Sequence, residues 1–505
     1  MTFPLLTVLA LVPIVGGLVL FFVKGGAGKT LGLAISLVTL ALGLWAFFSN
    51  GSLAEDHLWI ESIGAHYALG LDGMAKAMVL LTVVLVPIVL LAEWHVGDRD
   101  ERRRSASWST STFFALALVL EGLALFVFMA TDALLFYIFF EATLIPMYFL
   151  IGGWGGPRRG QAALKFLLYS LAGGLVMLLG IIGLGAHSAA SGNPSFLLDD
   201  LRALQLDGSV GRWLWLAFFI AFAIKAPMVP VHTWLPDTAE QSTPGASTLL
   251  VAILDKIGTF GMIRFCLELF PEASKWATPV VLGLAVLSIL YGALMAVGSR
   301  DLLRLVSYTS ISHFGFMVLG IFAFTTTSLN ASIFYMLNHG FSTAALFLAV
   351  GFLVRRRGTA DIDAFGGVQK LAPVAAGLLL VSGLSALALP GTSSFVSEFL
   401  VMAGAWQRHP RLVAVAAIGT VLAAVYVMRM YQRTMTGPVT EQSAAHFTDN
   451  DLDWREKAVM VPLVALLIGL GFVPKPMMQV TENTAKDTMA LVGMTDPAPI
   501  VKGEK

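Results

Sequence analysis

Apolar runs of about 20 residues, separated by short polar breaks, recur from one end of the 505-residue chain to the other. A helix of that length crosses a hydrocarbon core of about 30 Å. With 57% hydrophobic and 13% charged residues, the chain is far more apolar than an ordinary globular domain. The polar breaks are also too short to form a soluble domain. The first lysine is Lys24, so the first run lacks the basic flank of a cleaved signal peptide. The pattern predicts an all-α polytopic membrane protein whose first run is a retained span.

About fourteen transmembrane helices are predicted when Gly, Pro and charge clusters are taken as breaks. The expected spans are residues 3–23, 31–49, 74–96, 110–130, 132–152, 160–187, 213–236, 246–270, 276–298, 302–323, 331–354, 372–404, 410–434 and 457–478.

Basic residues favour the cytoplasmic side of a membrane. Eighteen of them lie in loops that this count places in the cytoplasm: Lys24, Lys29, Arg99, Arg102, Arg103, Arg104, Arg158, Arg159, Arg300, Arg304, Arg355, Arg356, Arg357, Lys370, Arg429, Arg433, Arg455 and Lys457. The opposite side receives nine, which predicts both termini outside.

Two of these spans are predicted to be broken helices. The seventh carries Pro227 and Pro230, and the twelfth carries LALPGTSSF at residues 387–395. Proline removes a backbone donor, and the freed groups are tolerated in a membrane where they face protein or water. The two breaks lie five spans apart. Because this number is odd, the two broken helices cross the membrane in opposite directions, as corresponding helices do in the inverted repeats of transporters. We therefore expect inverted five-helix repeats in spans 4–8 and 9–13, and four segments along the chain: residues 1–109 (three helices), 110–270 (first repeat), 276–435 (second repeat) and 436–505 (a helix and a tail).

Ionisable residues within the spans are the candidate functional residues, because each costs roughly 3 kcal/mol to insert and usually faces a bundle interior or a water path. They are Glu121, Glu141, Lys165, Lys225, His232, Lys256, His313, His339 and Glu398. Burial disfavours the charged forms of lysine and glutamate, so both exchange protons more readily, and histidine already titrates in that range. The pattern predicts a proton relay. We further hypothesise that Glu141 holds Lys225 charged and that loss of this contact favours deprotonation of Lys225.

Other interpretations remain open for single residues. One buried His or Glu is more often a satisfied core group, but several in consecutive spans favour a relay. Glu121 and Lys165 fit a relay or a structural ion pair equally. Asp255 is interpreted as a local counter-charge for Lys256, and Arg264 is expected to extend to the outer membrane surface. A haem held by two histidines stays open, although no pair is spaced as an evident axial set.

Composition excludes several function classes. With a single cysteine, Cys266, the chain offers no CxxC motif, no set of iron–sulfur ligands and no disulfide framework. Its formal net charge is zero, which argues against a surface for nucleic acid. Redox chemistry within this chain is therefore not expected.

Five separated motifs, in order, resemble a known family. They are FEATLIPMYFLIGGWG, IKAPMVPVHTWLPDT, SYTSISHFGF, HGFSTAALF and LPGTSSFVSEFL. Together they resemble the antiporter-like membrane subunits of NADH:quinone oxidoreductase, respiratory complex I, over about residues 70–435. Glu398 makes the chain resemble the M-type branch most, which includes mitochondrial chain 4. Sister subunits typically carry lysine at this position. Two places depart from the usual pattern of the family: Ser394 stands where glycine is usual, and the segment AEQSTPGASTLLVAILDKIG differs where span 7 leads into span 8.

This resemblance implies roles for individual residues. Glu141 and Lys225 match the family's essential Glu/Lys pair, Lys256 its central lysine, and Glu398 the group at the exit side. His232, His313 and His339 match polar residues of the central axis. By the same resemblance, protons cross through this chain while NADH, FMN, iron–sulfur clusters and quinone are bound by other subunits. No cofactor is therefore expected in this chain.

The resemblance also implies partners and a location. The expected partners are other complex I subunits, especially sister antiporter-like subunits and a lateral helix from one of them, together with membrane lipids. The expected location is a bacterial cytoplasmic membrane. A subunit of a multi-subunit Na+/H+ antiporter is the alternative function. A membrane scaffold with incidental buried charges is a third, and it predicts that neutralising Glu141 or Lys225 would harm assembly alone.

Overall fold

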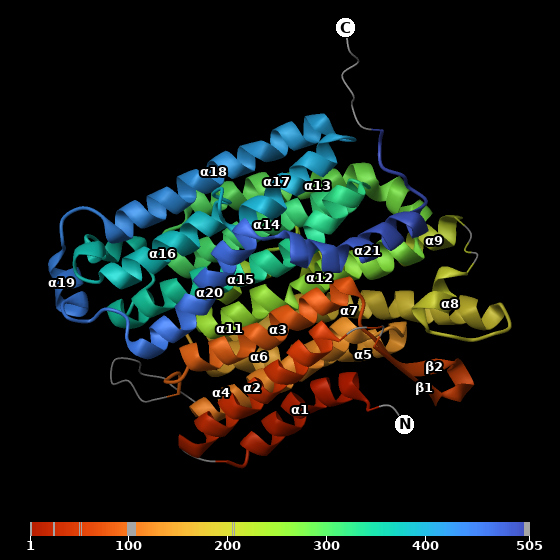
Figure 1. The fold of residues 1–505 in the computed structure, drawn as a ribbon, viewed down its shortest axis with the longest axis horizontal. Helices are drawn as coiled ribbons and strands as arrows, with labels where there is room; N and C mark the ends of the chain where they lie inside the picture. Colours follow the sequence, from red (N-terminus) through yellow and green to blue (C-terminus); the bar gives the residue numbers. More distant parts are fainter. Residues whose placement is uncertain are drawn as a thin grey trace, which may run out of the picture.

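A bundle of helices that lie side by side makes up most of the molecule (Figure 1). The computed structural model describes residues 3–23, 26–49, 51, 53–97, 108–204, 206 and 208–498. Within these ranges, ten helices are long and apolar enough to cross a membrane, and an eleventh is added if a pair bent by 72° counts as one span. The prediction of an all-α multi-pass membrane protein is confirmed at this level.

The helices follow the predicted spans closely, and each predicted span coincides with at least one of them. The helices that begin in the N-terminal half are α1 Leu5–Leu20, α2 Gly26–Phe48, α3 Gly73–Ala92, α4 Thr110–Met129, α5 Ala133–Ala142, α6 Leu144–Gly153, α7 Arg159–Ala190, α8 Leu198–Arg202, α9 Gly208–Lys225, α10 Trp234–Gln241 and α11 Pro244–Thr248. The remainder are α12 Lys256–Gly261, α13 Pro271–Gly298, α14 Leu302–Phe322, α15 Thr326–Arg357, α16 Pro373–Ala386, α17 Ser393–Trp406, α18 Pro410–Met435, α19 Glu441–Phe447, α20 Trp454–Phe472 and α21 Lys475–Val492.

Both predicted breaks are present. The chain leaves α9 at Lys225 and resumes a helix at Trp234, so Pro227 and Pro230 lie in the unwound stretch. Likewise α16 ends at Ala386 and α17 begins at Ser393. Ring constraints and missing backbone donors are local properties of proline, which is why the sequence located these breaks.

The predicted span at residues 246–270 differs from a regular helix. It consists of α11, a π-helical turn at Leu249–Leu254, α12 and a second π-helical turn at Met262–Leu267. Between the two turns, α12 packs against α9 so closely that a Cβ on Gly258 would overlap the backbone of Ala226. Wider turns of this kind accompany functional positions in many helices. Here they flank Lys256, the first residue of α12.

Two elements were not predicted. Strands β1 Ala54–Ile60 and β2 Ala65–Gly70 pair as an antiparallel hairpin, where we expected a loop. The hairpin is anchored to the bundle because Glu55 accepts a hydrogen bond of 2.7 Å from the Leu6 backbone amide at the start of α1. The C-terminal segment, expected as a tail, forms α21, which packs against α3 and α15.

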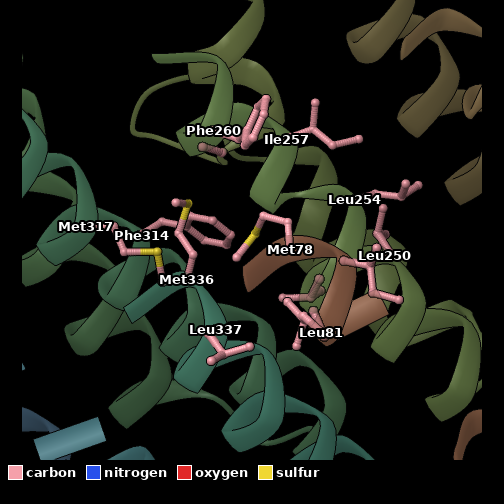
Figure 2. Close-up of a cluster of buried hydrophobic side chains, with 14 of the residues drawn as sticks. Met78, Leu81, Leu250, Leu254, Ile257, Phe260, Phe314, Met317, Met336 and Leu337 are labelled. Atoms are coloured by element: carbon pink, nitrogen blue, oxygen red, sulfur yellow. The ribbon is translucent and has the colours of Figure 1, made fainter. Parts of the chain in front are cut away.

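Burial identifies the centre of the bundle. The most apolar 18-residue stretches of α14 and α15 are 100% and 94% buried, whereas those of α2 and α18 are 28% and 33% buried. Figure 1 places α2 and α18 at opposite edges. In the interior, Met78 of α3, Phe314 of α14 and Met336 of α15 meet side chains of the π-helical turn and α12 (Figure 2). Methionine fills irregular gaps well, and these contacts join the two halves of the chain.

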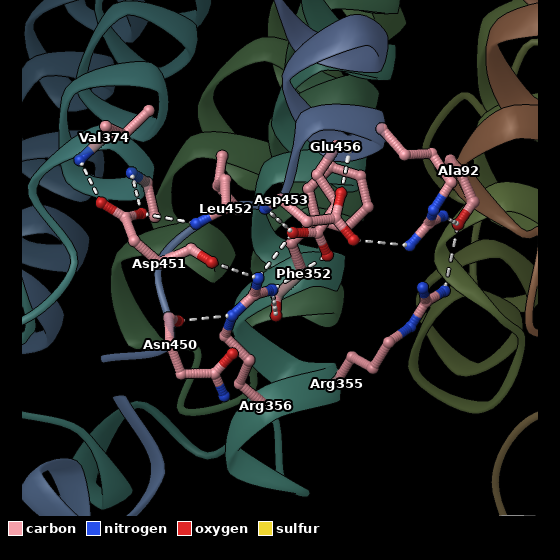
Figure 3. A network of polar contacts seen from close by, with 12 residues as sticks. Ala92, Phe352, Arg355, Arg356, Val374, Asn450, Asp451, Leu452, Asp453 and Glu456 are labelled. Carbon is pink, nitrogen blue, oxygen red and sulfur yellow. Dashed lines mark hydrogen bonds and ion pairs between the residues drawn. The ribbon is translucent and has the colours of Figure 1, made fainter. Parts of the chain in front are cut away.

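A polar network closes one end of the bundle (Figure 3). The Arg356 guanidinium donates to both Glu456 carboxylate oxygens, at 3.0 and 2.5 Å, which joins α15 to α20. The neighbouring Arg355 donates to the carbonyl of Ala92 at 3.2 Å and so reaches α3. Bidentate pairs of arginine and carboxylate fix geometry as well as charge. The network therefore holds the ends of three helices together.

Candidate proton path

The first part of the candidate path is a glutamate and a lysine at helix ends. Glu141 lies in the last turn of α5, and Lys225 is the last residue of α9, directly before the break. Lys225 is 1% exposed, and its ammonium lies 5.5 Å from the ring centroids of Phe140 and Phe166. Within the described residues, neither the Lys225 Nζ nor the Glu141 Oε1 has a hydrogen-bond partner. The pair is thus close enough to interact electrostatically and yet is not bonded.

Asp255 connects this pair with the next lysine. It is completely buried between the π-helical turn and α12, and its two carboxylate oxygens lack hydrogen-bond partners among the described residues. It lies near enough to Lys225 and Lys256 to interact electrostatically with both. Our interpretation of Asp255 as a local counter-charge for Lys256 was therefore too narrow, because the packing of α12 against α9 also brings it near Lys225.

Lys256 stands where the two halves of the chain meet. Its ammonium donates to the carbonyl of Val251 at 2.9 Å and lies 2.8 Å from the Nδ1 of His339 on α15. It also lies 4.5 Å from the ring centroid of Phe314 on α14. A carbonyl, an imidazole and an aromatic face together solvate a buried ammonium without a bound carboxylate. The 2.8 Å contact places this ammonium within proton-transfer distance of the His339 imidazole.

From His339 the path continues by direct contacts. The rings of His339 and His313 have centroids 5.3 Å apart. The His313 Nδ1 lies 2.6 Å from the Tyr335 hydroxyl, which donates to Glu398 Oε2 at 2.9 Å. A phenol has one proton, so while Tyr335 donates to Glu398, the His313 Nδ1–H must donate to Tyr335. The Thr420 hydroxyl donates to the other oxygen of Glu398 at 2.6 Å.

Three of the predicted site residues are not part of this series of contacts. His232 lies in the break after α9, where its ring centroid is 4.9 Å from that of Tyr291 and its Nδ1 has no partner in the described part of the chain. Lys165 donates to Asp237 at 2.6 Å and to the Thr233 carbonyl at 3.0 Å, which favours an ion pair over a relay. Glu121 on α4 is 1% exposed, and its carboxylate has no hydrogen-bond partner among the residues described.

The sequence analysis did not select Tyr335 or Thr420. Tyr335 precedes His339 by four residues on α15, and residues at this spacing share a helix face, so this signal could have found it. Nothing local marks Thr420, which reaches Glu398 from α18 through tertiary packing. Arg264 pairs at 2.6 Å with Asp72, the residue directly before α3, so its charge is directed toward that end of the helix.

The arrangement offers groups for proton transfer. Among the described residues, no three His, Cys, Asp or Glu side chains are grouped as a metal site. Acidic, basic, imidazole and phenol groups instead follow one another through the centre of the bundle, from Glu141 to Glu398. This series can receive, hold and release protons.

Comparison with known proteins gives a consistent assignment. The family described as NADH:quinone oxidoreductase/Mrp antiporter, TM matches residues 130–423. NADH-quinone oxidoreductase subunit M of Mycobacterium tuberculosis is 44% identical over 537 residues, with 99% of this chain and 96% of that protein covered. NADH-ubiquinone oxidoreductase chain 4 of Arabidopsis thaliana is 34% identical over 477 residues, with 92% and 93% covered.

Two solved structures share the fold. A chain of respiratory complex I from Thermus thermophilus with bound NADH matches with a TM-score of 0.88 and 32% identity, covering 97% of this chain and 100% of that chain. A chain of the Mrp complex from Dietzia sp. DQ12-45-1b matches with a TM-score of 0.83 and 97% and 100% coverage, and at 21% identity it shows the common fold alone. The chain belongs to the NADH:quinone oxidoreductase/Mrp antiporter family of membrane subunits, in the branch of subunit M and chain 4 homologues.

Proposed function

We propose that this chain is the proton-translocating M-type membrane subunit of an NADH:quinone oxidoreductase. The observation that carries the proposal is the series from the half-buried Glu141 through the buried Lys225, Asp255 and Lys256 to Glu398, in a chain 44% identical to a subunit M. Protons move along this series while NADH oxidation and quinone reduction take place in other subunits. In this proposal NADH, FMN, iron–sulfur clusters and quinone are bound by those subunits and not by this chain.

Fourteen spans complete the proposed architecture, with inverted repeats in spans 4–8 and 9–13 and with segments at residues 1–109, 110–270, 276–435 and 436–505. The two broken helices, α9/α10 and α16/α17, support the repeats because they occupy equivalent positions. In the first repeat the break adjoins Lys225. In the second, α17 carries Glu398 in the turns after the break.

Contacts among the basic residues support the proposed orientation. Arg158 and Arg304, both assigned to the cytoplasm, bind the same residue, Glu240, at 2.8 and 2.9 Å. Arg202, which is assigned to the opposite side, pairs with Glu268. Arg264, which lies in a span, pairs with the same glutamate. The proposed location is a bacterial cytoplasmic membrane with both termini outside. Lys24, Arg99, Arg102, Arg103, Arg104, Lys502 and Lys505 also belong to this assignment and lie outside the described residues.

Protons are proposed to arrive from the cytoplasmic face through the break after α9. A cleft of about 240 Å³ lies at that face, lined by Arg158, Lys165, Asp237 and Arg304 among others. Lys165, which lines the cleft, donates to the carbonyl of Thr233, the last residue of the unwound stretch. The other end of that stretch follows Lys225 directly, so the stretch connects the cleft with Lys225. Glu398, at the far end of the series, is the proposed release group.

The partners are proposed to be sister antiporter-like subunits, a lateral helix from one of them, and lipids. The exposed apolar surface of the edge helices supports this, since Trp45 on α2 and Val421 on α18 are 57% and 66% exposed. Large apolar side chains at the edge of a bundle fit lipid or another membrane helix.

The test is NADH-driven proton uptake into inverted membrane vesicles, with the wild type compared to Lys225→Ala and Glu141→Gln and with complex assembly checked on native gels. We expect assembled complexes in which NADH oxidation and proton uptake fall together, by about tenfold or more, because each variant removes a proton carrier. Loss of sodium/proton exchange alone would establish the antiporter function instead. Loss of assembly alone would establish a scaffold.

A further inference from the structure

A glycine on α7 leaves the space that the Glu141 carboxylate occupies. Gly174 is buried in the middle of α7, opposite the end of α5. A Cβ built on Gly174 would overlap the Glu141 Oε1 and would lie 3.1 Å from its Oε2. The carboxylate therefore rests directly against the backbone of α7, in a notch that any larger residue would fill.

The notch holds a carboxylate oxygen that has no partner. Within the described residues, the Glu141 Oε1 is buried without a hydrogen bond, and so is the Lys225 Nζ on the neighbouring α9. A glutamate and a lysine that are largely shielded from water attract each other most strongly at direct contact. Here the glutamate instead lies in the notch, where it influences Lys225 through space without bonding to it.

We propose that Gly174 is a positioning residue for the Glu141/Lys225 pair. This inference rests on the proposed function. The glycine keeps a place for the carboxylate outside direct contact with Lys225, so that the lysine is not locked into an ion pair and can release its proton. A larger side chain at position 174 displaces the carboxylate, changes the separation of the two groups and slows each proton transfer, because interaction between charges in a dry interior varies steeply with distance.

A purely structural role is the competing explanation. Glycine also allows helices to approach closely in membranes, and α5 packs against α7. The two explanations differ in their dependence on residue 141. If a larger residue at position 174 acts by disturbing helix packing, its effect does not depend on the length of side chain 141. If it acts by displacing the carboxylate from the notch, its effect does depend on that length. Aspartate, one methylene shorter, withdraws from the notch.

The first experiment compares Gly174→Ala with Gly283→Ala. Gly283 lies in the interior of α13, and a Cβ there has no neighbour within 4 Å. NADH-driven proton uptake by the assembled complex should fall about tenfold in Gly174→Ala, as for a misplaced reacting group, and should stay at the wild-type level in Gly283→Ala. Wild-type uptake in Gly174→Ala would overturn the proposal.

A double variant separates positioning from packing. In a Glu141→Asp background, Gly174→Ala should cause no further loss, because the shorter carboxylate no longer occupies the notch. The same fractional loss in both backgrounds would show that the glycine acts through helix packing, and would overturn the proposal.

Infrared spectroscopy reads the carboxyl group without turnover, so it decides the matter even if Glu141→Asp is inactive. The difference between wild type and Glu141→Gln identifies the band of Glu141. Gly174→Ala should shift that band in the assembled complex, and an unshifted band would overturn the proposal. The two ideas can fail separately: Glu141→Gln with normal pumping refutes the proposed function, while an unshifted band refutes the role of Gly174.

Discussion

The two halves of the path are held together in different ways. In the first half, Lys225 and Asp255 are buried and Glu141 is half-buried, yet atoms of all three lack hydrogen-bond partners in the described part of the chain. In the second half, His313, Tyr335 and Glu398 are linked by hydrogen bonds of 2.6 and 2.9 Å. Lys256, bonded to Val251 and His339, lies between the two halves.

This difference assigns different tasks to the halves. Unpartnered charged groups in a dry interior are costly, and their energies change strongly when a neighbour moves or water enters. They suit a switch. A hydrogen-bonded chain of imidazole, phenol and carboxylate suits rapid transfer without rearrangement. We infer that the first half controls when a proton moves and that the second half conducts it.

A large expected effect within the second half comes from Tyr335→Phe, which removes the hydroxyl between His313 and Glu398. Proton uptake driven by NADH should fall about tenfold in the assembled complex, because a relay group is lost from the conducting half. Tyr426→Phe is the matched control, since the Tyr426 hydroxyl is buried without a partner among the described residues. Equal uptake by the two variants would show that the bonded chain does not conduct.

The smallest expected effect comes from Lys165→Met, measured by proton uptake and by thermal stability of the complex. Lys165 and Asp237 are 34% and 38% exposed, so their ion pair contributes about 1 kcal/mol or less. We expect uptake within about twofold of the wild type, the size of effect that such an energy allows. Lys486→Met, at an exposed pair with Glu482, provides the comparison. A tenfold loss specific to Lys165 would place this residue in the relay and extend the controlling half to the surface.

Local chemistry explains what the sequence could predict. Apolar length located the spans, and proline located both breaks, because each acts within a few residues of chain. The charged and imidazole residues Lys225, Lys256, His339 and Glu398 could be selected because such groups are rare inside membranes. Of these, Lys256 and His339 lie in direct contact in the structure.

Tertiary packing explains what the sequence could not predict. Asp255 acts on Lys225 only because α12 lies against α9, and two π-helical turns in one span leave no proline or glycine signal of their own. Helix α21 was not predicted because it is amphipathic and about half of its residues are polar. Its hydropathy is therefore too low to indicate a membrane span. The Gly174 notch depends on a side chain 33 positions away in the sequence, and helix propensity alone would prefer alanine there.

The most direct test of one continuous path is proton uptake per NADH oxidised in inverted vesicles that contain Lys256→Met. Methionine keeps the length of the side chain and removes the proton carrier that contacts His339 at 2.8 Å. Lys76→Met is the control, because the Lys76 ammonium reaches the Ser49 carbonyl at 3.4 Å near the start of α3. We expect Lys256→Met to assemble and its proton uptake to fall about tenfold or more, while the control pumps normally. Normal uptake by an assembled Lys256→Met complex would contradict a path that joins the two halves at this lysine.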